Sequence, residues 1–171
     1  MRKRISIVSF FGIIVLVVLL VLPKEYLSIQ NDGVYFNMTD KALEKIKGKS
    51  IEIEHNIGDT PFERYIYAEQ MYGYQARCSY SFYKSLFGLR LRRVFVEISD
   101  ISFDDANTVI DKINGTLINY YSNKRGYYNY GLQVEDNALY LVLGTSSGAV
   151  GNSYHIKYEN GNLTISAIKQ E

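Results

Sequence analysis

An uncharged apolar segment of eighteen residues, 5–22, directly follows the basic start Met1-Arg2-Lys3-Arg4. Fifteen of the eighteen are Ile, Val, Leu or Phe. At helical rise the segment would be about 27 Å long, close to a hydrocarbon core of about 30 Å. The sequence therefore predicts a transmembrane anchor at 5–22, preceded by a cytoplasmic tail at 1–4.

The alternative for this segment is a cleaved secretory signal, whose apolar region usually spans about 7–15 residues and ends in a small-x-small site. The segment here is longer, and Pro23-Lys24-Glu25-Tyr26-Leu27 follows it without such a site. An uncleaved anchor is therefore favoured. Because basic flanks stay in the cytoplasm, we expect a single-pass cell-membrane protein with a cytoplasmic N-terminus and the lipid bilayer as a partner through 5–22.

The rest of the chain is expected to form a stalk at 23–32 and one extracytoplasmic domain at 33–171. About 145 residues beyond the anchor are enough for one hydrophobic core. The net charge is +1, or −2 once the three basic residues at positions 2–4 are removed, so no nucleic-acid partner is expected. Cys78 is the only cysteine, which excludes a fold that depends on an intramolecular disulfide.

The first part of the domain predicts a short helix followed by a strand. Thr39 or Asp40 can cap a helix at 41–47, because their side-chain oxygens accept hydrogen bonds from the first free amides. Gly48 then ends the helix. Apolar and polar residues alternate over 51–56, the period of a half-buried strand.

The tyrosine-rich block 62–87 fits two strands around a bend at 71–73, with a helix around 65–72 as the alternative. Residues 89–98 predict a better-defined strand, whose apolar residues change phase near Arg92-Arg93. One extra residue there would return both groups to the same face, so a β-bulge is expected at this point.

The clearest helix of the domain is predicted to begin at Ser102, which with Asp105 resembles a capping box. Six apolar positions then recur every three or four residues and predict one buried stripe: Ala106, Val109, Ile110, Ile113, Leu117 and Tyr120 or Tyr121. The helix is expected to end within 122–126.

The last third of the chain predicts strands. Residues 132–134 and 139–143 are expected to be strands, and Gly144–Gly151 a flexible loop. Residues 154–158 and 163–168 predict a hairpin around Asn160-Gly161, since both residues tolerate positive φ. The fold class is therefore predicted as α+β: the transmembrane helix, then one domain with a mainly antiparallel sheet and one or two helices on one face.

The sequence contains no strong signal for a metal, a cofactor or a catalytic group. His55 and His155 fall in separate predicted strands, and zinc needs three or four convergent ligands. Cys78 lies within a predicted strand, where a lone cysteine is usually a small buried apolar residue. No cofactor, no metal and no catalytic residue are therefore expected.

Tyrosine is the main compositional feature, with sixteen residues and no tryptophan. Three of them, Tyr127, Tyr128 and Tyr130, follow Lys124-Arg125 in a predicted turn. An exposed cluster of aromatic and basic side chains is typical of a contact surface. These five residues are the binding candidates that the sequence offers.

These patterns predict a membrane-anchored extracytoplasmic binding or accessory module for a protein or envelope component, in a more specific version an inhibitor or immunity-type protein. Two alternatives stay open. One is an enzyme that processes envelope polymers with carboxylates such as Glu97, Asp100 or Glu135. The other is a structural subunit of a membrane complex, which a broad exposed apolar face would favour.

Overall fold

The computed structural model describes residues 27, 29, 32–56, 62–86, 88–135, 137–147 and 150–170. Two helices and eight strands occur in this part of the chain. The helices are α2 (Asp40–Lys47) and α3 (Phe103–Tyr121). The strands are β1 (Glu52–Asn56), β2 (Phe62–Met71), β3 (Tyr74–Ser85), β4 (Gly88–Ile98), β5 (Tyr127–Glu135), β6 (Ala138–Ser147), β7 (Val150–Glu159) and β8 (Asn162–Gln170).

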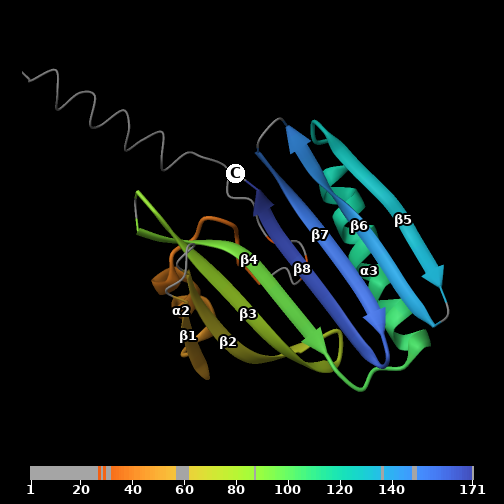
Figure 1. The fold of residues 1–171 in the computed structure, drawn as a ribbon, viewed down its shortest axis with the longest axis horizontal. Helices are drawn as coiled ribbons and strands as arrows, with labels where there is room; N and C mark the ends of the chain where they lie inside the picture. The colour runs from red at the N-terminus through yellow and green to blue at the C-terminus, as the bar shows by residue number, and fades with distance from the viewer. Residues whose placement is uncertain are drawn as a thin grey trace, which may run out of the picture.

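The strands form one antiparallel sheet in the order β1-β2-β3-β4-β8-β7-β6-β5 (Figure 1). Each half of the described chain is a helix followed by four consecutive strands: α2 with β1–β4, and α3 with β5–β8. The last strand of each half lies at the centre, where β4 pairs with β8. The first strand of each half therefore forms an edge of the sheet.

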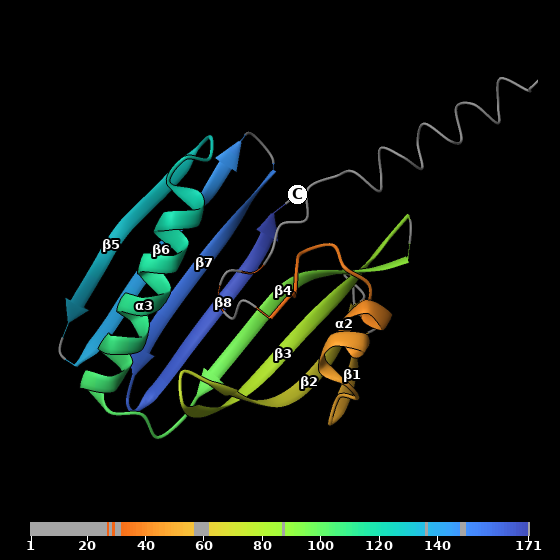
Figure 2. The ribbon, with the colours of Figure 1, turned by 180° about the vertical axis from the view of Figure 1, so that it is seen from behind.

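Both helices cover the same face of the sheet, as Figure 2 shows. The apolar stripe of α3, from Ala106 to Tyr121, is buried against the strands, and Leu43 of α2 is buried in the same core. Leu27 and Ile29 also belong to this core. The opposite face of the sheet has no helix over it among the described residues.

The predicted fold class, a transmembrane helix followed by an α+β domain, is wrong. The described part of the chain is mostly an eight-stranded antiparallel sheet with two helices. Neither described helix combines the length and the apolar composition that a membrane crossing requires. The longer helix, α3, carries Asp104, Asp111 and Lys112 outside its apolar stripe. The predicted anchor at 5–22 and the predicted tail at 1–4 lie outside the described residues.

Several local predictions are confirmed. The helix capped by Ser102, the hairpin at Asn160-Gly161 and the strands that contain the two histidines are all present. The bulge is also present, since Ser81 pairs with Arg93 and the next residue, Phe82, pairs with Leu91. The block 62–87 forms strands β2 and β3, so the alternative helix around 65–72 is wrong.

Two predictions about irregular segments need correction. The turn expected at Tyr127, Tyr128 and Tyr130 is instead the start of β5. The loop expected from Gly144 to Gly151 is mostly strand, since β6 continues to residue 147 and β7 begins at residue 150. Residues 148 and 149 lie outside the described part.

Candidate functional site

The uncovered face of the sheet carries a groove that follows β3. Its floor consists of Ser79 and Ser81, both buried although they face away from the helices. Ser81 lies between Arg64 of β2 and Arg93 of β4. A small side chain flanked on both sides by long ones leaves a channel, because neighbouring strands are only about 4.8 Å apart.

The same arrangement recurs one row further along. Ser79 lies between Ile66 of β2 and Phe95 of β4, and Phe95 has Ser166 of β8 as its neighbour on the other side. Ile66 is buried, whereas Phe95 is 37% exposed. Each wall of the groove thus has one arginine and one apolar residue.

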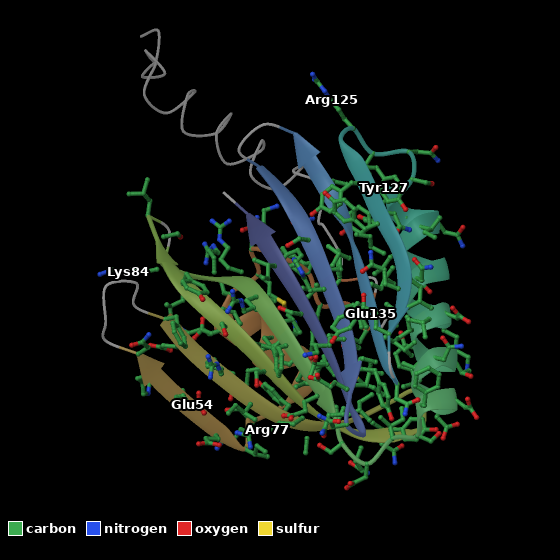
Figure 3. All side chains as sticks on the ribbon, turned by 45° about the vertical axis from the view of Figure 1, so that its right-hand side comes forward. Glu54, Arg77, Lys84, Arg125, Tyr127 and Glu135 are labelled. Carbon is green, nitrogen blue, oxygen red and sulfur yellow. The ribbon has the colours of Figure 1, made fainter. Side chains whose placement is uncertain are left out.

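Charged residues complete the lining of this hollow, which has a volume of about 450 Å³. Arg77 and Glu97 are cross-strand neighbours in the row after Ser79, and Glu54 lies beside Arg64 at the β1 side. In Figure 3, Glu54 and Arg77 lie on the part of the sheet formed by β1, β2 and β3. We call this hollow the β3 groove, and its lining consists of Glu54, Arg64, Ile66, Arg77, Ser79, Ser81, Arg93, Phe95, Glu97 and Ser166.

Two of the three arginines are paired within the protein. Arg64 donates to Glu54 at 2.7 Å, and Arg77 donates to Glu52 at 3.3 Å. Arg93 is exposed and its backbone pairs with β3 and β8, but its guanidinium has neither a hydrogen-bond nor an ion-pair partner among the described residues. An arginine carries five N–H donors in a planar fork that matches a carboxylate. Arg93 is therefore the cation of the β3 groove that is open to a ligand.

The tyrosine cluster predicted from the sequence lies elsewhere, at the end of the molecule where α3 turns into β5 (Figure 3). Lys124 and Arg125 are exposed there. Tyr127 packs partly against the core, while Tyr128 and Tyr130 contact each other with ring centroids 5.7 Å apart. Tyr130 is 73% exposed. The structure thus divides the five candidates between the core edge and the surface.

Burial, followed by the neighbouring Tyr130, raises the pKa of Tyr128. Its hydroxyl lies close to Gly144 of β6, where an added Cβ would be 2.7 Å from the oxygen and 2.1 Å from the backbone oxygen of Asn152. Tyr128 therefore lies across the sheet rather than reaching out to solvent. Only Tyr130, Lys124 and Arg125 retain the exposure that a contact surface needs.

A partly buried cation lies on the covered face, at the end of α2. Lys47 forms ion pairs with Asp32 and Glu69, and Tyr80 donates its hydroxyl hydrogen to Glu69 at 2.9 Å. Burial lowers the pKa of Lys47, but the hydrogen bonds to both carboxylates outweigh it and raise the pKa overall.

Burial and the charge of Glu69 raise the pKa of the nearby Cys78 to about 12. The thiol is therefore protonated at neutral pH and is a poor nucleophile.

The described residues contain no group of three or more His, Cys, Asp or Glu side chains that could hold a metal ion. The carboxylates suggested for an enzyme are dispersed. Glu97 lines the β3 groove, Glu135 lines a separate hollow beside Phe103 and Tyr140, and Asp100 lines neither. Figure 3 shows Glu135 on β5, at the opposite side of the sheet from Glu54.

The arginines of the β3 groove were missed at the sequence level. Arg64, Arg77 and Arg93 are separated by 13 and 16 positions in the chain, and only strand pairing brings them together. The signal available in the sequence was the alternation of serine with larger residues along β3.

Comparison of the chain with protein-family models, with curated proteins and with solved structures finds no match.

Proposed function

We propose that the protein is a non-catalytic binding module whose β3 groove receives an acidic, extended segment of a partner protein. The observation that carries the proposal is the open guanidinium of Arg93, which lies across buried Ser81 from Arg64. The two arginine Cα atoms are two strand spacings, or roughly 10 Å, apart. A carboxylate in this channel would be within reach of both side chains.

The apolar part of the groove supports a protein segment rather than a simple anion. Phe95 and Ile66 stand opposite each other one row from the arginines. An extended segment places alternate side chains on one side at intervals of about 6.6 Å, which is two strand residues. A partner with an acidic residue and, two positions later, an apolar residue would therefore match both rows.

The charge of the groove also supports this choice over a nucleic acid. Arg64, Arg77 and Arg93 are partly balanced by Glu54 and Glu97 within the same lining. Nucleic-acid surfaces gain most of their affinity from an excess of cations along the phosphates. A mixed lining with one open arginine is better suited to a short acidic contact.

Among the alternatives, the dispersal of Glu97, Asp100 and Glu135 supports binding over polymer hydrolysis, which needs two converging carboxylates. The large apolar side chains exposed in the described part are scattered over several elements rather than gathered in one broad face. They are Ile46, Ile51, Ile53, Leu86, Phe95, Tyr130 and Val134.

Location at the cell membrane, with the domain outside the cytoplasm, stays a prediction that rests on residues 1–22.

The test uses a fluorescently labelled synthetic peptide with the repeat Glu-Ser-Leu-Ser, which places glutamate and leucine in turn on the same side of an extended chain. We expect it to bind the wild-type protein, and Arg93→Ala to weaken binding roughly tenfold or more, since a hydrogen bond to a charged group contributes about 1.5–3 kcal/mol. Fluorescence anisotropy measures the dissociation constants. The matched control is Arg125→Ala, which removes the same charge from an exposed position outside the groove.

A peptide with glutamine in place of glutamate is expected to lose most of its affinity. The proposal is wrong if Arg125→Ala weakens binding and Arg93→Ala does not, because the tyrosine cluster would then be the contact surface. It is equally wrong if inorganic polyphosphate binds through Arg93 while the acidic peptide does not bind at all.

A further inference from the structure

β1 is an edge strand with regular geometry. It pairs with β2 over five consecutive residues without a shift in register. The opposite edge strand, β5, is interrupted between Asn129 and Leu132, where Gly131 has a φ of +74°. Bulges are one way in which proteins protect an edge from further pairing. β1 lacks this protection, and no described strand occupies its outer side.

A second hollow lies directly beside this edge, between β1 and α2. Its volume is about 290 Å³. Asp40 and Glu44, four residues apart on α2, contribute two carboxylates and Lys49 contributes one cation, while Ile53 and Tyr67 contribute apolar surface. Ile53 is 45% exposed. The hollow thus combines an apolar floor with a rim on which carboxylates outnumber cations by two to one, beside the edge where a strand could be added.

The other face of β1 carries two further carboxylates. Glu52 and Glu54 point to the uncovered side of the sheet, where they pair with Arg77 and Arg64. A carboxylate has two oxygens and can accept from more than one donor. An additional cation beside the edge would therefore be stabilised on this face also.

A second copy of the chain is disfavoured at this edge in the register centred on Ile53. Two β1 strands pairing antiparallel about Ile53 would set Glu52 of each copy opposite Glu54 of the other. Like charges directly opposite each other destabilise a strand pair. The charge of the edge instead fits an extended segment with basic residues.

We infer that β1 receives an extended basic segment of a partner protein as a ninth strand of the sheet. Main-chain hydrogen bonds along the outer side of β1, at Glu52 to His55, supply affinity, as in other cases of strand addition. Every second side chain enters the hollow, where a lysine or arginine stem packs on Ile53 and Tyr67 and its charge reaches Asp40 and Glu44. This site adjoins the β3 groove at Glu54 and takes the opposite charge.

The test uses a labelled peptide in which lysine and valine alternate, added to the full-length protein. We expect binding that Glu44→Gln weakens roughly two- to fivefold, the effect of losing one solvent-exposed ion pair. The matched control, Glu135→Gln, changes the same charge at the far edge and is expected to leave binding unchanged. A second peptide, N-methylated on alternate residues, keeps the charges but cannot donate to a strand edge, and it is expected not to bind.

Hydrogen exchange provides the positional evidence, since amides in 52–56 are expected to exchange more slowly when the lysine–valine peptide is present. Equal binding of the N-methylated peptide would overturn the inference, as would equal effects of the two glutamate variants. The absence of any binding would overturn it too. None of these results touches the β3 groove, which is tested by the acidic peptide and Arg93→Ala.

Discussion

At the scale of single residues, Lys47 shows how this fold holds a charge inside a largely apolar layer. It ends α2, and its two carboxylate partners come from other segments, Asp32 before the helix and Glu69 on β2. The side chain of Lys47 is 12% exposed. The network therefore joins three segments, and each partner depends on the others to balance its buried charge.

Lys47→Met is expected to lower the free energy of unfolding by about 3–5 kcal/mol, because it leaves Asp32 and Glu69 without their cation. Urea unfolding at neutral pH measures the effect. Lys112→Met, at an exposed position of α3, is the control and is expected to change stability by no more than about 0.5 kcal/mol. Equal stability of the wild type and Lys47→Met would show that the network contributes little.

The same variant has a second readout in its pH dependence. A raised pKa in the folded state means that the contribution of Lys47 is fully present below its ordinary pKa of 10.5 and is lost as pH rises through the folded value. The stability difference between wild type and Lys47→Met is therefore expected to be constant at neutral pH and to shrink above about pH 10.5. A difference that grows with pH would contradict the assignment.

At the scale of elements, the helices begin where side-chain caps are available. Ser102 accepts a hydrogen bond from the Asp105 amide at 3.2 Å and donates to its carboxylate at 2.8 Å. Thr39 accepts from the Ala42 amide at 3.1 Å. These caps satisfy amides that have no partner within the helix.

Ser102→Ala is expected to destabilise the protein by about 1 kcal/mol, the usual effect of removing an N-cap side chain. Thermal or urea unfolding measures it. Ser122→Ala is a suitable control, since Ser122 lies at the opposite end of α3 and is exposed. If the two variants are equally stable, the capping contact contributes nothing measurable to the fold.

Elements set by local signals could be predicted from the sequence, and elements set by packing could not. The cap at Ser102 and the Asn160-Gly161 turn depend on a few adjacent residues, and both predictions are confirmed. The segment around Gly144 has the composition of a flexible loop, yet it is strand. The glycine is required there by close contact with the backbone of Asn152 and the hydroxyl of Tyr128, not by a need for flexibility.

At the scale of the whole molecule, the β3 groove exists because of strand order. Arg64, Ser81 and Arg93 form one row only when β3 lies between β2 and β4 in the observed register. Single-sequence patterns show that each segment is a strand, but a shift of one residue would move every side chain to the other face. They also do not show which face the helices leave uncovered. The sequence therefore indicates the binding candidates at Lys124–Tyr130 only through their expected exposure and their aromatic and basic side chains.

The most direct test of the groove's function is a hydrogen-exchange map of the full-length protein with and without the glutamate–leucine peptide. Slower exchange is expected within β2, β3 and β4, around Arg64, Ser81 and Arg93, with no change in 124–130. Protection confined to 124–130, or no change anywhere in the described strands, would contradict binding in the β3 groove.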